Sequence, residues 1–108
     1  MSSLRRGEIR WYTFKPPNKR RPIVLLTRDD AIDALNEIVA AAVTTSIRDI
    51  STQVRLSVDE GVPQPCAINL DHVHLAQRSN IGPLIATLRD ERWPEVEHAL
   101  LVACGFRR

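Results

Sequence analysis

Arginine, threonine and serine side chains in two separate parts of this chain can together bind a phosphate group. Arg21 stands directly before one apolar run, and a polar stretch after a second apolar run contains Thr44, Thr45, Ser46 and Arg48. Guanidinium and hydroxyl groups donate hydrogen bonds to phosphate oxygens, and the arginine fork binds two oxygens at once. The pattern therefore predicts a cradle for a phosphodiester at one end of a sheet. Solvated polar turns have the same composition and are the alternative.

Other kinds of chemistry have little support in the sequence. It contains no GxGxxG, no Walker loop, no paired-cysteine site and no nucleophile elbow. His72 and His74 alternate along a predicted strand, but no third metal ligand accompanies them, so we expect surface histidines and no metal or cofactor. His98 is expected to be exposed on a helix, and Trp93 to anchor a core or an interface.

The segment that carries Arg21 is predicted to be rigid. Residues 22–27 are β-branched or leucine residues with nothing polar among them until Thr27, which predicts a buried strand. Pro22 opens the strand, where a missing N–H costs least. Residues 5–14 predict a strand with one buried face and one aromatic and basic face, and residues 15–19 predict a turn.

Residues 29–43 have two interpretations. Their apolar residues fall at helical spacing, with Asp29 or Asp30 as a cap, which predicts one amphipathic helix. Alternatively the chain breaks near Asn36 and continues as a buried strand over residues 38–44. Periodicity alone does not choose between them.

The rest of the chain predicts short strands and a closing helix. The strands are expected at residues 52–58, 66–70, 73–76 and 84–88, with Val58 on the buried face of the first and Gly82-Pro83 separating the last two. Helical spacing begins near Asp90, which can cap the helix, and Gly105 can end it. We predict a mainly β fold, a small barrel of short strands with a C-terminal α-helix, as a single domain over residues 1–108.

Composition limits the class of protein. The chain is 44% apolar and 26% charged, as ordinary globular proteins are, and no apolar run reaches the roughly 20 residues of a membrane span. The N-terminus lacks the apolar region of a secretory signal. Cys66 and Cys104 have no metal-site spacing, so both are predicted to be core residues of a protein in a reducing cytoplasm.

Charge is distributed unevenly along the chain. Residues 1–28 contain eight basic residues and one acidic residue, for a net charge of +7, whereas the remainder carries −5, giving +2 overall. Such asymmetry suggests a face for a polyanion. A basic edge strand that prevents aggregation is the alternative.

Four motifs, in order, connect the chain to a known family. RRGEIRW, RRPIVLLTRD, VAAAVTTSIRD and QVRLSVDEGVPQPCAINLDHV are similar to the MazF/PemK family of type II toxin–antitoxin endoribonucleases. The resemblance implies an SH3-like, CcdB-type barrel with a C-terminal helix, which favours the strand at residues 38–44. It also implies a homodimer, a metal-independent endoribonuclease for single-stranded RNA, and neutralisation by a MazE-like antitoxin.

The motifs also imply roles for individual residues. Arg21 and Thr44 match the catalytic pair of the family. Arg21 is expected to stabilise the charged phosphorane or assist the leaving group, because its high pKa makes it a poor base. Thr44 would donate a hydrogen bond to a phosphate oxygen, and the products would carry 2′,3′-cyclic phosphate and 5′-OH ends.

The first loop departs from the pattern of some family members. Residues 15–20 form a shortened loop without a carboxylate, which leaves the general base unassigned. We therefore expect the RNA to be held by cations, hydroxyls and a stacking ring. The predicted RNA-binding residues are Phe14, Lys15, Lys19, Arg20, Thr45, Ser46 and Arg48. The alternatives are a non-catalytic RNA-binding module and a CcdB-like poison that acts by protein contact on gyrase.

Overall fold

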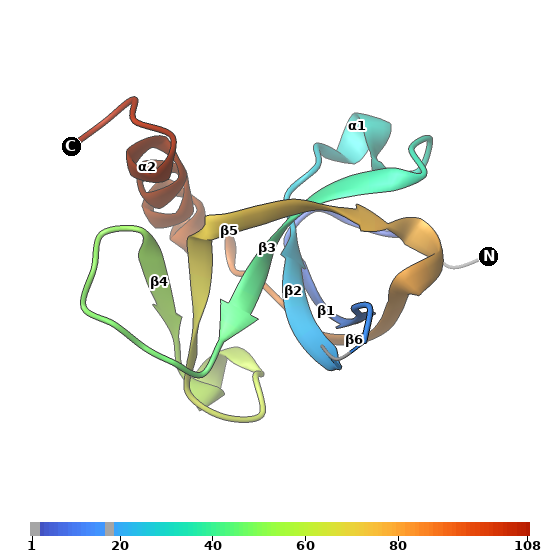
Figure 1. Cartoon of the computed structure of the whole chain (residues 1–108), viewed down its shortest axis with the longest axis horizontal. Helices are drawn as coiled ribbons and strands as arrows, with labels where there is room; N and C mark the ends of the chain where they lie inside the picture. Colours follow the sequence, from blue (N-terminus) through green and yellow to red (C-terminus); the bar gives the residue numbers. More distant parts are fainter. Residues whose placement is uncertain (1–2, 17–18) are drawn as a thin grey trace.

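One antiparallel sheet organises the molecule, which is described by a computed structural model for residues 3–16 and 19–108. The strands are β1 (Glu8–Thr13), β2 (Arg20–Leu25), β3 (Glu37–Thr44), β4 (Gln53–Leu56), β5 (Cys66–Gln77) and β6 (Ile81–Thr87). The helices are α1 (Asp29–Ile32) and α2 (Trp93–Ala103), with short 3₁₀ turns η1 (Val58–Glu60), η2 (Arg78–Asn80) and η3 (Asp90–Arg92). The strand order is β4-β5-β3-β2-β1-β6 (Figure 1).

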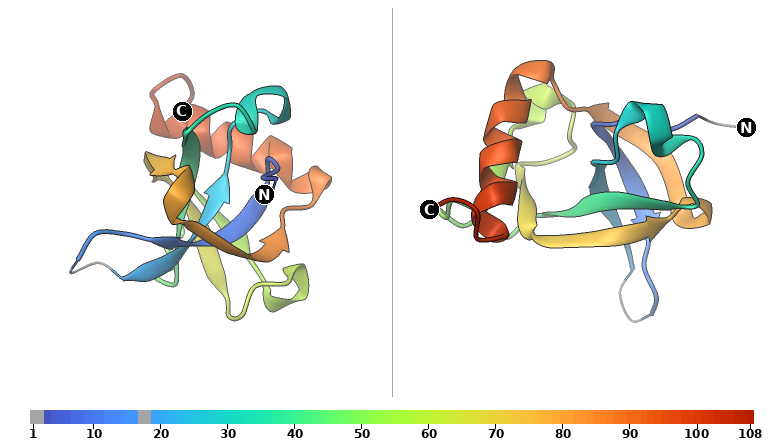
Figure 2. Two further views of the ribbon diagram at one scale, coloured as in Figure 1. Left: turned by 90° about the vertical axis from the view of Figure 1, so that its right-hand side faces the viewer. Right: turned by 90° about the horizontal axis from the view of Figure 1, so that it is seen from above.

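The mainly β fold with a C-terminal helix is confirmed. The sheet curves strongly, but its edge strands β4 and β6 do not pair with each other within the described residues, so the barrel is open. Helix α2 lies at one end of the curved sheet (Figure 2). No helix in the described part of the chain is long and apolar enough to cross a membrane.

The strand interpretation of residues 38–44 is correct. The helix is limited to α1, and β3 begins at Glu37. Ile38 and Ala40 on one face of β3, and Ala41 and Val43 on the other, are all buried. As a strand between β2 and β5, this segment can bury side chains in an apolar core on each face of the sheet, whereas an amphipathic helix would leave one side in water.

Two apolar cores occupy opposite faces of the sheet, and β2 contributes to both. The helix-side core consists of Ile9, Val24, Ala41, Val43, Val54, Leu56, Val62, Cys66, Ile68, Leu70, Leu88, Val96 and Ala99. The second core consists of Leu4, Tyr12, Ile23, Leu25, Ile32, Ile38, Ala40 and Ala76. Because side chains alternate along a strand, Val24 enters the first core, and Ile23 and Leu25 enter the second. The predicted burial of this strand is confirmed.

Several expectations about β1, β4 and β5 were wrong. The second face of β1 is not a solvent face, because Tyr12 is buried in the second core. Val58 lies in η1 and is 53% exposed, because β4 ends at Leu56. Residues 66–70 and 73–76 belong to the single twelve-residue strand β5, which bends in the middle (Figure 1).

The C-terminal part of the chain also required corrections. Gly82 and Pro83 lie inside β6 instead of separating strands. Asp90 begins η3 and does not cap α2, which starts without a side-chain cap at Arg92. Cys104 is exposed because it follows the last turn of the helix, although Cys66 is buried as predicted. The turn predicted at residues 15–19 includes residues 17–18, which lie outside the described residues.

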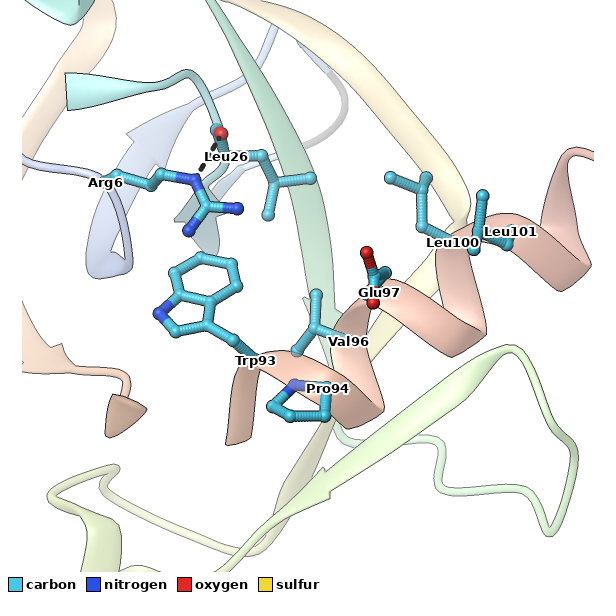
Figure 3. A pocket seen from close by; sticks show the side chains of 8 residues that line it. All are labelled: Arg6, Leu26, Trp93, Pro94, Val96, Glu97, Leu100 and Leu101. Atoms are coloured by element: carbon cyan, nitrogen blue, oxygen red, sulfur yellow. Dashed lines mark hydrogen bonds between the residues drawn. The ribbon is translucent and has the colours of Figure 1, made fainter. Parts of the chain in front are cut away.

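Trp93 anchors helix α2 to the N-terminal part of the chain. Its ring packs against the helix-side core, and the Arg6 guanidinium lies 3.6 Å from the ring centroid (Figure 3). Arg6 also donates a hydrogen bond to the Leu26 carbonyl oxygen. Gly7 has a φ of +91°, a backbone conformation that favours glycine, and a Cβ at this position would meet the Trp93 ring at 3.0 Å. Both the backbone conformation and the lack of space therefore require glycine here.

Arg92 joins the start of α2 to β4 and η1. Its guanidinium contacts the Glu60 carboxylate and donates to the Arg55 carbonyl oxygen at 2.6 Å. Burial alone would raise the pKa of Glu60, but the Ser57 N–H and the Arg92 guanidinium outweigh it and hold that pKa below 4.5.

Glu60→Gln is expected to reduce stability in a pH-dependent manner. A depressed folded-state pKa stabilises the protein above pH 4.5 and loses that contribution as pH falls through the folded pKa. The variant should therefore lose up to about 2 kcal/mol at pH 7 and converge with wild type in acid. Urea unfolding between pH 7 and pH 3 measures this, with the exposed Glu91→Gln as control. A constant difference across this range would contradict the assignment.

Candidate active site

The β2–β3 register brings Arg21 and Thr44 together. Ile23 pairs with Ala42, Val24 with Ala41 and Leu25 with Ala40. The same register, continued two residues along β2, sets Arg21 opposite Thr44 at the end of the two strands. The two residues of the predicted catalytic pair, 23 positions apart in sequence, are thus neighbours on the rigid part of the sheet.

Two cavities meet at this pair. The larger cavity has a volume of about 620 Å³ and opens on the helix-side face. Besides Arg21 and Thr44, it is lined by Ile9, Trp11, Lys19, Arg20, Pro22, Val43, Thr45, Val62, Pro63, Gln64, Cys66 and Ile85. The smaller, of about 240 Å³, is lined by Phe14, Arg21, Ala42, Val43, Thr44, Asn69 and His72. The Arg21–Thr44 pair therefore forms the border between two hollows that open beside the end of one sheet.

The functional groups of the pair are available to a ligand. The four salt bridges formed among the described residues do not involve Arg21, whose side chain is exposed. The Thr44 hydroxyl oxygen accepts a hydrogen bond of 3.0 Å from the Ser46 N–H. This contact uses a lone pair and leaves the hydroxyl proton free to be donated. A free guanidinium beside a free hydroxyl donor is suited to an anionic oxygen.

The structure brings only part of the predicted RNA-binding set to these cavities. Lys19, Arg20 and Thr45 line the larger cavity and Phe14 lines the smaller one. Lys15 is exposed and lines neither. Ser46 and Arg48 also lie outside both cavities.

The polar loop after β3 instead uses two of these residues to hold its shape. The Arg48 N–H donates to the Gln53 side-chain oxygen at 2.7 Å, and the Gln53 amide donates to the Ser46 carbonyl oxygen at 3.3 Å. The loop is thus held by backbone contacts of Ser46 and Arg48. Among the described residues, neither side chain has a hydrogen bond or an ion pair that would place it at the pair.

Sequence reasoning missed four polar or aromatic residues of the site: Trp11, Gln64, Asn69 and His72. Trp11 lies under Arg20, whose guanidinium is 4.9 Å from the ring centroid. This cation–π contact holds Arg20 at the rim of the larger cavity. The alternation of aromatic and basic residues in β1 was a usable signal for Trp11, whereas nothing local pointed to Gln64.

The electrostatics of the site are one-sided. The ionisable residues that line the larger cavity are Lys19, Arg20, Arg21 and Cys66, and burial raises the pKa of the Cys66 thiol, with Glu60 adding to the effect. No carboxylate is among the residues that line either cavity in the described part of the chain. The arrangement can hold a phosphodiester between two hollows that admit flat rings. The described residues contain no group of three side chains suited to a metal ion.

Comparison with known proteins places this geometry in context. The family model described as PemK-like, MazF-like toxin of type II toxin–antitoxin system matches residues 5–103. The probable endoribonuclease MazF2 of Mycobacterium tuberculosis is 31% identical over 103 residues, which cover 94% of this chain and 99% of the relative. The probable endoribonuclease MazF5 of the same species is 34% identical over 104 residues, covering 95% and 94%.

Solved structures show the same fold. The Mycobacterium tuberculosis toxin MazF-mt6 superposes with a TM-score of 0.85 at 24% identity, covering 94% of this chain and 99% of that one. An endoribonuclease from a mycobacterial species, solved in complex with its cognate antitoxin, gives a TM-score of 0.84 at 18% identity, with coverage of 98% and 99%.

The two thiols are expected to react with Ellman's reagent at different rates in the native protein. The thiolate is the reactive form, so burial and a raised pKa should make Cys66 at least about tenfold slower than the exposed Cys104. Cys104→Ser should remove the fast phase and Cys66→Ser should keep it. Two thiols that react equally fast before unfolding would contradict the burial of Cys66.

Proposed function

Since the chain belongs to the family of PemK-like, MazF-like toxins of type II toxin–antitoxin systems, we propose that it is a toxin that cleaves single-stranded RNA without a metal ion. The observation that carries this proposal is the position of Arg21 and Thr44, opposite each other and shared by two cavities. A phosphodiester bound at the pair would have one nucleoside on each side of it.

Cleavage would proceed by attack of the RNA 2′-OH on the adjacent phosphorus. The Arg21 guanidinium would stabilise the extra negative charge of the phosphorane, and the Thr44 hydroxyl would donate a hydrogen bond to a phosphate oxygen. The bond to the 5′-oxygen then breaks, leaving a 2′,3′-cyclic phosphate and a 5′-OH. Because the nucleophile belongs to the RNA, no metal-bound water is needed.

Binding would rest on charge and stacking. Lys19 and Arg20 add positive charge beside Arg21, and the Trp11 ring lies in the wall of the larger cavity. Phe14 lies in the wall of the smaller one, where a base can stack on it. Lys15, Ser46 and Arg48 lie outside both cavities and would contact RNA only beyond the two central nucleotides.

The proposal includes partners. A MazE-like antitoxin would neutralise the toxin in the cytoplasm by placing an acidic or apolar segment over the same cavities and competing with RNA. The whole chain, residues 1–108, would act as a single toxin domain without a cofactor.

A homodimer is also part of the proposal. Val39, Val73 and Leu75 on β3 and β5, with the nearby Leu35, are exposed apolar side chains beside a cavity of about 530 Å³. A second copy would remove this surface from water.

Arg21→Ala is expected to lower the cleavage rate by at least roughly a hundredfold, the cost of losing one electrostatic stabiliser of the transition state. A long unstructured RNA is incubated in EDTA with each protein, and the fragment ends are sequenced. Wild type should cut at one short recurring sequence and leave 5′-OH ends. Arg28→Ala, which changes an exposed arginine paired with Asp30, is the matched control and should retain activity.

Two outcomes would contradict the ribonuclease proposal. RNA that is bound but left intact by wild type would indicate a binding module. Growth arrest by both wild type and Arg21→Ala, with RNA intact, would indicate a poison that acts by protein contact. A fully active Arg21→Ala protein would instead move the catalytic centre away from this pair.

The dimer is tested by light scattering on a size-exclusion column. We expect twice the 12.2 kDa mass of one chain. Leu75→Glu places a charge on the exposed apolar surface and should shift the mass toward the monomer. A wild-type protein that elutes only as a monomer at micromolar concentration would remove the dimer from the proposal.

A further inference from the structure

The proposed reaction needs a proton acceptor for the 2′-OH, and the Arg21–Thr44 pair does not supply one. A guanidinium stays protonated across the physiological range, and a threonine hydroxyl does not take up a proton there. Of the described residues that line the smaller cavity, only Arg21 and His72 have ionisable side chains. In the larger cavity Lys19, Arg20 and Arg21 are cations, and the Cys66 thiol has a raised pKa. His72 is thus the one side chain lining either cavity, among the described residues, whose type titrates near neutral pH.

A bulge in β5 puts His72 on the same face as the pair. Asn69 pairs with Ala42, but the next residue of β3, Ala41, pairs with Val73, so residues 70–72 have no partner across the ladder. In a regular strand Asp71 would follow Asn69 on this face. The three unpaired residues reverse the alternation, so His72 and His74 occupy the face of Asn69 instead. Bulges of this kind redirect side chains next to active sites.

Hydrogen bonds hold the bulge in this arrangement. The Asp71 carboxylate accepts a hydrogen bond of 2.7 Å from the Thr52 hydroxyl, and the Asp71 N–H donates to the Asn69 side-chain oxygen at 3.1 Å. Asp71 is thus tied to the segment before β4. The bend of β5 at this point is visible in Figure 1.

The ring of His74 packs beside His72 and against two aromatic rings. The His74 ring centroid lies 5.7 Å from that of His72, 5.3 Å from that of Phe14 and 5.6 Å from that of Tyr12. His74 Nε2 is buried and has no hydrogen-bond partner among the residues that the structure describes. Burial, with a contribution from His72, lowers the pKa of His74, which favours the uncharged form of that ring.

We propose that His72 is the general base of this active site, an inference that rests on the proposed ribonuclease function. The neutral imidazole takes the proton of the 2′-OH while the 2′-oxygen forms its bond to phosphorus. The bond from phosphorus to the 5′-oxygen breaks, and that oxygen takes a proton from solvent water. The imidazolium releases its proton to solvent and the base is restored, so no net proton is consumed.

This role has a defined pH dependence. The rate should rise with pH, with a slope near one, and level off once the His72 imidazole is neutral. The groups that face His72 are His74 on its own strand, Arg21 from β2, the uncharged Ala42 and Thr44 from β3, and Phe14 after β1. Asp71 is adjacent but bound to Thr52.

The test uses the cleavage site mapped with wild-type protein. His72→Gln should lower kcat/KM at pH 7.5 by roughly a hundredfold, the lower range for loss of a general base, and should lose the rise between pH 5.5 and 7.5. Affinity for an RNA with 2′-deoxyribose at the cleavage position should change by less than about threefold, because that RNA has no proton for the base to take. Added imidazole should partly restore cleavage by His72→Ala and should not rescue Arg21→Ala.

The control is His98→Gln, at an exposed histidine of α2 that lines neither cavity, which should behave as wild type. A His72→Gln protein that cleaves within threefold of wild type with the same pH profile would overturn the assignment and leave the ribonuclease proposal intact. A rate that falls with rising pH, through a limb lost in His72→Gln, would make His72 an acid and overturn its role as the base. A wild-type protein that cleaves no RNA would remove both proposals.

Discussion

The pairing register of β2 with β3 is the constraint on which the rest of the structure depends. Ile23, Val24 and Leu25 are completely buried, and each such side chain contributes about 1.5–3 kcal/mol by leaving water. Because alternate residues enter different cores, a slip of one residue would move each of them to the wrong face. The same slip would separate Arg21 from Thr44. The free energy that fixes the fold therefore also fixes the geometry of the candidate site.

The two faces of the sheet have different roles at its open end. On the helix-side face, Pro22 and Val43 lead from the core into the larger cavity, and on the other face Ala42 leads into the smaller one. A phosphate bound at the strand ends would thus lie between two compartments whose walls continue the two cores. Strands make up much of these walls and keep them rigid. A nucleotide could therefore bind there without the entropy cost of ordering the protein.

Sequence patterns predicted the elements that are regular and missed those that are not. The apolar run of β2, the position of Arg21 at its start and the stripe of α2 follow from local composition and spacing. The prediction of strand β3 required the family resemblance. Its apolar residues fall at helical spacing, but tertiary contacts bury them on both faces of a strand. The bulge in β5 left no local signal, because Asn69 and Asp71 alternate as in any strand and only the partner register shows the change of face. His72 is exposed, as predicted, but its place beside the smaller cavity was not predicted. Cys104 was assigned to the core, although it follows the last turn of α2 and is exposed.

The distribution of charge explains why a neutral base fits this site better than a carboxylate. Two of the least exposed acidic side chains are held in structural contacts, Glu8 with Arg10 and Glu60 with Arg92. The cations at the cavities come from the start of β2, where Lys19, Arg20 and Arg21 are consecutive. A carboxylate placed among them would neutralise the field that attracts a polyanion and would compete with phosphate for Arg21. An imidazole is uncharged in the state that accepts a proton, so it can act beside the guanidinium without forming an ion pair that displaces the substrate.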